Sequence, residues 1–197
     1  MRSHRIRTSA AAITAVVALP LSLGAFAPQA FASNAASSTP SPFGPGCSKL
    51  PHSGKGSATG MSKERVATAA ANNPKLTKLA LALKDAGLTT KLNDAKHITV
   101  FAPTNAAFDK VSKKQLASLL KDKPKLKKIL TYHVVDKTIT PSELPNGSFK
   151  TLEGSKLKTS GSGTSFKVND TAKIVCGDIK TANATVYLVD EVLMPPS

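Results

Sequence analysis

The spacing of apolar positions divides the chain after residue 60 into a helical half and a strand-rich half. Up to Tyr132, apolar side chains recur at intervals of three and four residues, which places them on one face of a helix. From Phe149 onward they alternate with polar side chains, as in strands that are buried on one side only. Helices followed by an antiparallel meander predict an α+β domain.

Local start and stop signals support this division. Ser112 and Gln115 have the spacing of a capping box, and Gly87 is a residue type that commonly ends a helix. The predicted helical segments are 62–72, 74–86, 88–94, one after Thr104, one after Ser112, one after Pro124 and a single turn after Thr140. The predicted strands are 98–101, 133–135, 149–152, 155–159, 165–168, 172–175 and 185–193.

The stretch from Ile98 to Phe108, I-T-V-F-A-P-T-N-A-A-F, is the most fully specified part of the pattern. Its β-branched and aromatic start is typical of a buried strand, and Pro103 ends the pairing because proline has no N–H to donate. The hydroxyl of Thr104 can accept a hydrogen bond from a free N–H group of a following helix. The segment therefore predicts a strand, a corner and a helix in direct succession.

The first 32 residues have the pattern of an export signal. Three arginines precede an apolar run at 10–23, and a small-x-small sequence predicts cleavage between Ala32 and Ser33. The apolar run is short and contains Pro20, which argues against a retained membrane span. We therefore expect a secreted, extracellular protein, either free or associated with the cell wall.

A segment rich in Ser, Pro and Gly follows at 33–60 and predicts a linker, which leaves 61–197 for the folded domain. Cys47 lies in this linker, and Cys176 lies near the C-terminus. Two cysteines in an exported protein are expected to pair because that compartment is oxidising, and the bridge would tie the linker onto the domain. Two free thiols or an intermolecular bridge are the alternatives.

The charge balance favours anionic partners. Without the three arginines of the signal, the 27 basic residues fall to 24, against 12 acidic ones. Arg65 is then the only arginine. Reading of nucleic-acid bases and bidentate clamping of phosphate depend on arginine, so we expect no specific nucleic-acid recognition.

Eight lysines gather on the predicted helices around residues 110–128, where Asp109 and Asp122 are the only acidic residues. Most fall opposite the leucines, so one interpretation is an ordinary solvated face. The other is a patch for anionic polymers of the cell envelope, such as acidic polysaccharides. The eight are Lys110, Lys113, Lys114, Lys121, Lys123, Lys125, Lys127 and Lys128.

Three segments resemble the signature blocks and closing strand of the fasciclin-like (FAS1) domain: T-V-F-A-P-T-N-A-A-F at 99–108, I-L-T-Y-H-V-V at 129–135 and V-Y-L-V-D-E-V-L-M-P-P at 186–196. The motifs G-P-G-C, N-N-P-x-L and V-C-G are similar to those of single-domain secreted immunogenic proteins of mycobacteria, whose two cysteines are bridged. The resemblance implies a β-wedge of about seven mostly antiparallel strands with helices packed along it. It also implies adhesion to cell-surface or matrix proteins.

Tyr132 and His133 match a tyrosine-histidine pair that has been linked to integrin binding in animal members of the family. The structural alternative is that His133 continues the inward stripe of Leu126 and Ile129. A histidine at such a position is more often a hydrogen-bonded core group than a contact residue. Both interpretations stay open at this point.

The pattern contains no arrangement typical of an enzyme. After the signal only His52, His97 and His133 remain, and none has the spacing of a metal site or of a nucleophile elbow. We therefore expect no catalysis, no cofactor and no metal. A carrier of a small apolar ligand, bound between helices and strands, is a third hypothesis without specific support. Glycosylation patterns occur at Asn146, Asn169 and Asn183.

Overall fold

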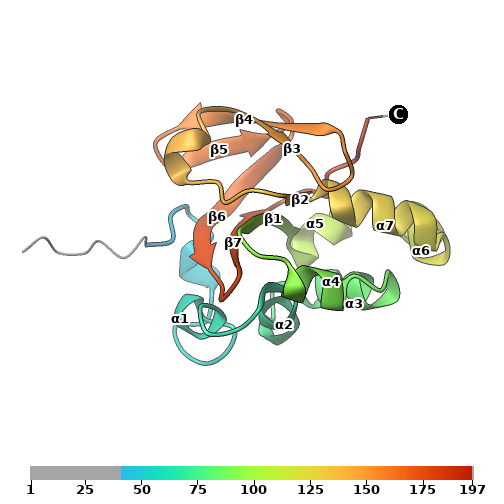
Figure 1. Ribbon diagram of the computed structural model, residues 1–197, viewed down its shortest axis with the longest axis horizontal. Coiled ribbons are helices and arrows are strands. Elements are labelled where there is room, and N and C mark those ends of the chain that lie inside the picture. The colour runs from blue at the N-terminus through green and yellow to red at the C-terminus, as the bar shows by residue number, and fades with distance from the viewer. Residues whose placement is uncertain (1–40, 197) are drawn as a thin grey trace, which may run out of the picture. The chain divides into compact units, whose positions relative to one another are not determined.

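The computed structural model describes residues 41–196 (Figure 1). The predicted signal at 1–32, its cleavage site and the first part of the linker lie outside these residues. The helices are η1 (Cys47–Lys49), α1 (Ala58–Met61), α2 (Val66–Asn72), α3 (Thr77–Asp85), α4 (Thr89–Asp94), α5 (Asn105–Lys110), α6 (Lys113–Lys121), α7 (Lys123–Tyr132) and η2 (Pro141–Glu143). The strands are β1 (Ile98–Pro103), β2 (Val134–Val135), β3 (Asn146–Lys150), β4 (Lys156–Ser162), β5 (Ser165–Val168), β6 (Ala172–Lys180) and β7 (Ala184–Val189). Within the described range, no helix is both long and apolar enough to cross a membrane.

The strands of the described residues form one seven-stranded sheet in the order β2-β1-β7-β6-β5-β4-β3. Neighbouring strands are antiparallel except β1 and β7, which run parallel. The two edges of the sheet meet, because Val135 bridges to Thr151 and the amide of Leu152 donates to the carbonyl oxygen of Val134 at 2.7 Å. The predicted α+β wedge of about seven mostly antiparallel strands is confirmed.

The central stretch forms the strand, corner and helix that its sequence predicts. All six residues of β1 are buried, because the strand pairs on both sides and packs on both faces. The hydroxyl of Thr104 accepts a hydrogen bond from the amide of Ala107 at 3.4 Å, which caps the start of α5. The amide of Thr104 donates to the carbonyl oxygen of Val189 at 3.1 Å. The corner is therefore fixed to the end of β7.

The two faces of the sheet enter two separate cores. One core lies between the sheet and the helices and contains Leu79, Val100 and Val186. The other fills the inside of the curled sheet, where the rings of Phe101 and Tyr187 stack with their centroids 5.5 Å apart. Successive residues of a strand point to opposite faces, so Val100 and Phe101 serve different cores. This division explains why β1 and β7 are mostly apolar on both faces, with Thr99 and Thr185 as buried polar exceptions.

Two helices begin later than their sequence pattern predicts. α2 begins at Val66, whose amide donates to the Oδ1 atom of Asn183 at 2.8 Å. α3 begins after Pro74, because the side chain of Asn73 accepts the amide of Lys75 at 2.9 Å and holds the proline in a turn. In both places an asparagine side chain sets the start of the helix.

The last two strands differ from prediction in length. β6 runs beyond its predicted end to Lys180, because a bulge at Asp178 keeps it paired with β7 through two shifts of register. The φ angle of Asp178 is +58°, in the left-handed region. β7 ends at Val189, earlier than predicted. The next residue, Asp190, still bonds to Lys173 of β6: its amide donates to the carbonyl oxygen at 3.1 Å, and its carboxylate accepts the amide at 2.7 Å.

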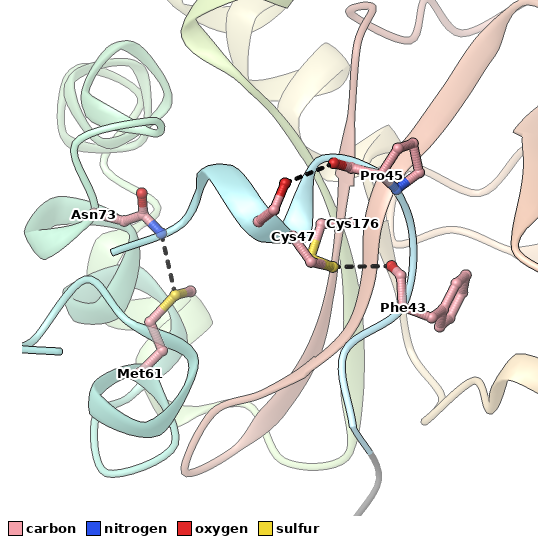
Figure 2. Close-up of a disulfide and its surroundings, with 7 residues drawn as sticks. Phe43, Pro45, Cys47, Met61, Asn73 and Cys176 are labelled. Carbon is pink, nitrogen blue, oxygen red and sulfur yellow. Dashed lines mark hydrogen bonds between the residues drawn. A yellow bond between two sulfur atoms is a disulfide. The ribbon is translucent and has the colours of Figure 1, made fainter. Parts of the chain in front are cut away.

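Part of the expected linker is built into this fold. Phe43 exchanges two backbone hydrogen bonds with Gly177, at 3.1 and 2.8 Å. The neighbouring Cys47 forms a disulfide with Cys176, and their Cα atoms lie 4.8 Å apart (Figure 2). Position 177 requires glycine here, because a Cβ atom would lie 2.5 Å from the Phe43 ring. The predicted pairing of the two cysteines is therefore present, and it holds residues 43–50 against β6.

Candidate functional site

The signature pair Tyr132 and His133 lies inside the protein, at the junction of α7 and β2. The two residues are only 2% and 1% exposed. The Tyr132 hydroxyl donates to the carbonyl oxygen of Lys156 at 3.2 Å and accepts from the Nδ2 atom of Asn169 at 2.8 Å. Tyr132 therefore joins the end of α7 to β4 and to the turn between β5 and β6.

His133 is uncharged, and its ring links α7 to the segment after β7 by hydrogen bonds. Its Nδ1 atom lies 2.9 Å from the carbonyl oxygen of Ile129, and its Nε2 atom accepts the amide of Leu193 at 2.9 Å. This pattern assigns the ring proton to Nδ1. Burial lowers the pKa of the ring to about 4, and the hydrogen bond to Ile129 opposes this shift. The burial favours the structural interpretation of the pair, because a partner protein cannot reach either side chain.

The eight lysines around residues 110–128, which we call the helical lysine surface, are all exposed. They lie at the end of α5 and along α6 and α7, and these two helices extend to one side of the sheet (Figure 1). Two have acidic partners: Lys110 Nζ lies 3.0 Å from Asp190 Oδ2, and Lys128 Nζ lies 3.5 Å from Glu153 Oε1. Among the described residues, the other six have no carboxylate oxygen within 4.0 Å.

A hollow of about 760 Å³ opens beside the starts of β1 and β7, and sequence reasoning did not find it. Its basic lining residues are Arg65, Lys96 and Lys180. Arg65 Nη1 lies 3.0 Å from Asp94 Oδ1, and Lys180 pairs with the buried Asp178. The lining comes from four separate segments, so no local motif marks it. Two of these three positive groups are already paired with carboxylates, which leaves the hollow weakly cationic.

The comparisons with known proteins settle the family. The model of the fasciclin domain family matches residues 74–195. The chain belongs to the fasciclin (FAS1) family. The immunogenic protein MPB70 of Mycobacterium bovis is 44% identical to it over 162 residues, which cover 78% of this chain and 82% of that protein. The cell surface glycolipoprotein MPB83 of the same species is 46% identical over 149 residues, or 73% of this chain and 66% of that protein.

Solved structures agree on the fold of this FAS1 domain. The FAS1 domain pair of the insect cell adhesion molecule Fasciclin I matches with a TM-score of 0.58 and 18% identity. The match covers 69% of this chain and 52% of the two-domain chain. At this identity the likeness shows a shared fold. The resemblance to FAS1 domains and to the mycobacterial immunogenic proteins is therefore confirmed.

The interior of the FAS1 domain is filled between the helices and the sheet. A void of about 10 Å³ remains there, lined by Met61, Leu79 and Val100 among others, which is at the lower limit for one water molecule. This void is too small to hold an apolar ligand of the size that a carrier binds. In the same residues, no group of three or more His, Cys, Asp or Glu side chains is placed to hold a metal ion.

In two of the three glycosylation patterns, the asparagine side chain forms hydrogen bonds with other segments of the fold. Asn183 accepts the amide of Val66, and its Nδ2 atom lies within 3.2 Å of the carbonyl oxygens of three residues in and after α4. Asn169 bonds to Tyr132 and accepts the amide of Lys158 at 3.0 Å. Asn146 is exposed at the start of β3. A glycan at Asn183 or Asn169 would break these contacts.

Proposed function

We propose that this FAS1 domain is a secreted, non-enzymatic module that adheres to proteins of other cells or of the extracellular matrix. The observation that carries the proposal is its similarity, over 73% of its length, to a protein named for its place on the cell surface. The shared fold with domains of an insect cell adhesion molecule supports the same class of function. The export pattern of the first 32 residues agrees with an extracellular role.

The adhesive contact belongs to exposed faces of the wedge. Tyr132 and His133 are buried, so their part is to hold α7, β4 and the segment after β7 in place. The exposed faces are those of α6 and α7 and the outer side of β3, β4 and β5 (Figure 1). We infer that the domain functions by binding other proteins through these faces.

A pull-down with the purified secreted protein tests this function. The immobilised protein is exposed to matrix proteins, cell-wall fragments and lipid vesicles, at low and at high salt, with heat-unfolded protein as the control. We expect retention of cell-surface or matrix proteins by the folded form that persists at high salt. Equal retention by the unfolded form, or none by either, would refute the adhesion proposal.

A second candidate function is binding of anionic envelope polymers by the helical lysine surface. Its support is that six of the eight lysines are exposed without a carboxylate partner among the described residues. Attraction of this kind is screened by salt, so retention on acidic wall polymers should disappear at moderate ionic strength. Binding that is indifferent to salt would count against it.

A further inference from the structure

A second group of lysines lies on the outer side of the sheet, on strands rather than on the helices that carry the helical lysine surface. It consists of Lys150 on β3, Lys156 and Lys158 on β4, Lys167 on β5 and Lys173 on β6, which we call the sheet lysine row. All five are exposed, while the residues that alternate with them, such as Phe149, Leu157 and Phe166, are buried in the inner core. No α-helix lies over this side of β3, β4 and β5 (Figure 1).

The strand register places lysines of this row directly opposite one another. Lys150 pairs with Lys156 across β3 and β4, and Lys167 pairs with Lys173 across β5 and β6. Directly opposed residues have Cβ atoms about 5 Å apart, and like charges in such pairs destabilise a sheet. The row therefore holds two repulsive pairs on one face. Lys158 lies on β4, two residues after Lys156 and on the same face.

The acidic side chains close to the row form no ion pairs with its lysines. No carboxylate oxygen of the described chain lies within 4.0 Å of any of the five Nζ atoms. Glu153 contacts Lys128 and accepts the amide of Ser155 at 3.1 Å. Asp170 accepts the hydroxyl of Ser160 at 3.2 Å. These carboxylates keep their charge, but none forms an ion pair with a lysine of the row, so they offset the repulsion within the two lysine pairs only at longer range.

The face also carries hydroxyl groups in register with the lysines. Ser148 lies opposite Lys158, and Ser160 lies opposite Lys167. Neighbouring strands are about 4.8 Å apart, close to the length of one sugar unit in an extended chain. We propose that the sheet lysine row binds a linear acidic polysaccharide, a chain of carboxylate-bearing sugars laid across β3, β4, β5 and β6. Its carboxylates would lie between the opposed ammonium groups, and its hydroxyls beside the serines.

The other common polyanions fit this face less well. Single-stranded nucleic acid needs exposed aromatic rings on which bases stack, and the rings of Phe149 and Phe166 face the inner core. A lipid surface calls for exposed apolar side chains next to the basic ones. The large exposed apolar side chains of the described residues, Leu81, Leu120 and Met194, all lie off these strands. The site is formed by residues other than those of the helical lysine surface, and it does not rest on the proposed contact with proteins.

Two variants with the same net charge test the assignment. In the sheet variant Lys150, Lys156, Lys167 and Lys173 are changed to Gln. In the helix variant Lys113, Lys121, Lys123 and Lys127 are changed to Gln. Binding of the unchanged protein and of both variants is measured by calorimetry at low salt with polygalacturonate, and with its fully methyl-esterified form as the uncharged control. Melting temperatures are recorded alongside.

We expect the sheet variant to bind polygalacturonate about tenfold more weakly than the unchanged protein, and the helix variant less than about threefold more weakly. The melting temperature of the sheet variant should not fall, because repulsive pairs are removed. If it does fall, the two single-pair variants K150Q/K156Q and K167Q/K173Q should each lose part of the affinity while staying folded.

Four results would overturn the proposal. They are no binding by the unchanged protein, equal binding of the methyl-esterified polymer, an equal loss in both variants, and a larger loss in the helix variant. The last of these would instead support the second candidate function above. None of them bears on retention of matrix proteins at high salt, so this site and the adhesion proposal can fail independently.

Discussion

Single polar side chains join segments that are far apart along this chain. His133 joins α7 to the segment after β7, and Asn183 joins the turn between β6 and β7 to α2 and α4. A buried polar group that loses its partner typically destabilises a protein by about 1–3 kcal/mol. These residues are therefore determinants of stability, although His133 belongs to a motif associated with binding and Asn183 to a glycosylation pattern.

Acidification should destabilise the protein through His133. Burial lowers the pKa of its ring to about 4 from an ordinary value of 6.5, so between these values the unfolded chain binds the proton more readily than the folded one. The stabilisation is fully present above pH 6.5 and should fall by up to roughly 3 kcal/mol as the pH drops to about 4. Urea unfolding at a series of pH values between neutral and 5 measures it.

Two variants isolate this effect. His133→Gln should be less stable at neutral pH, and its stability should be flat between pH 6.5 and 5. His97→Gln, at an exposed position, should keep the slope. Glu143 and Glu153 do not interfere, because hydrogen bonds and nearby lysines hold their pKa values below 4.5. If His133→Ala lost adhesion at an unchanged melting temperature, the ring would have to touch a partner directly.

Asn183→Ala should destabilise the protein strongly. The substitution leaves the amide of Val66 and the carbonyl oxygens at the end of α4 without their partner. We expect a loss of about 2–3 kcal/mol in the free energy of unfolding. Denaturant unfolding measures it, and Asn146→Ala, at an exposed position with the same side chain, should change stability by less than about 0.5 kcal/mol. Similar losses in both variants would contradict this role.

Helices whose start is marked by capping residues in the sequence form where the pattern predicts them. α6 begins after Ser112, whose hydroxyl accepts the amide of Gln115 at 3.3 Å, and the turn at η2 has a full capping box between Thr140 and Glu143. α2 shows the opposite case. Its start depends on Asn183, far downstream in the sequence, so no local signal could place it.

A charge reversal in the sheet lysine row tests the repulsion between its strands. Lys150→Glu places opposite charges at the Lys150–Lys156 pair and should raise the free energy of unfolding by about 0.5 kcal/mol at low salt. The double change K150E/K156E restores like charges and should remove the gain. Thermal unfolding of the two variants and of Lys156→Glu completes a double-mutant cycle. A coupling near zero would show that the two side chains do not interact.

For the whole molecule, the main long-range constraint outside the sheet is the disulfide between Cys47 and Cys176. It closes a loop with a sequence separation of 129 residues and lies beside the backbone bridge of Phe43 to Gly177. Phe43 also packs its ring against Phe166 inside the curled sheet, at 5.6 Å between centroids. The segment before α1 is thereby part of the fold.

Removing the disulfide should loosen this segment and lower stability. In the chain-entropy model, a loop of this length corresponds to about 5 kcal/mol, an upper figure for the loss in a C47S/C176S variant. Hydrogen exchange should show lost protection at the amides of Phe43, Gly46 and Gly177, which bond across the segment. The amides of β1 serve as an internal control and should open only with the whole fold. Unchanged protection at the three amides would show that backbone contacts alone hold the segment.

The predictions made from the amino-acid sequence alone rest on interactions between residues that are close together in the chain. The period of the apolar positions, the Pro103–Thr104 corner and the capping boxes act over a few residues, so the order of helices and strands follows from the chain's own pattern. The motifs of the two signature blocks likewise identified the family. The expectation that the two cysteines pair came from the compartment and from the family resemblance.

The tertiary structure decided which residues face one another. Tyr132 and His133 are buried, and they form hydrogen bonds with residues of β4, the β5–β6 turn and the segment after β7. Strand register set lysines against lysines across the sheet, and this register is fixed by the side chains that pack into the inner core. Contacts between residues far apart in the chain follow from the simultaneous packing of many segments, and no local pattern contains that information.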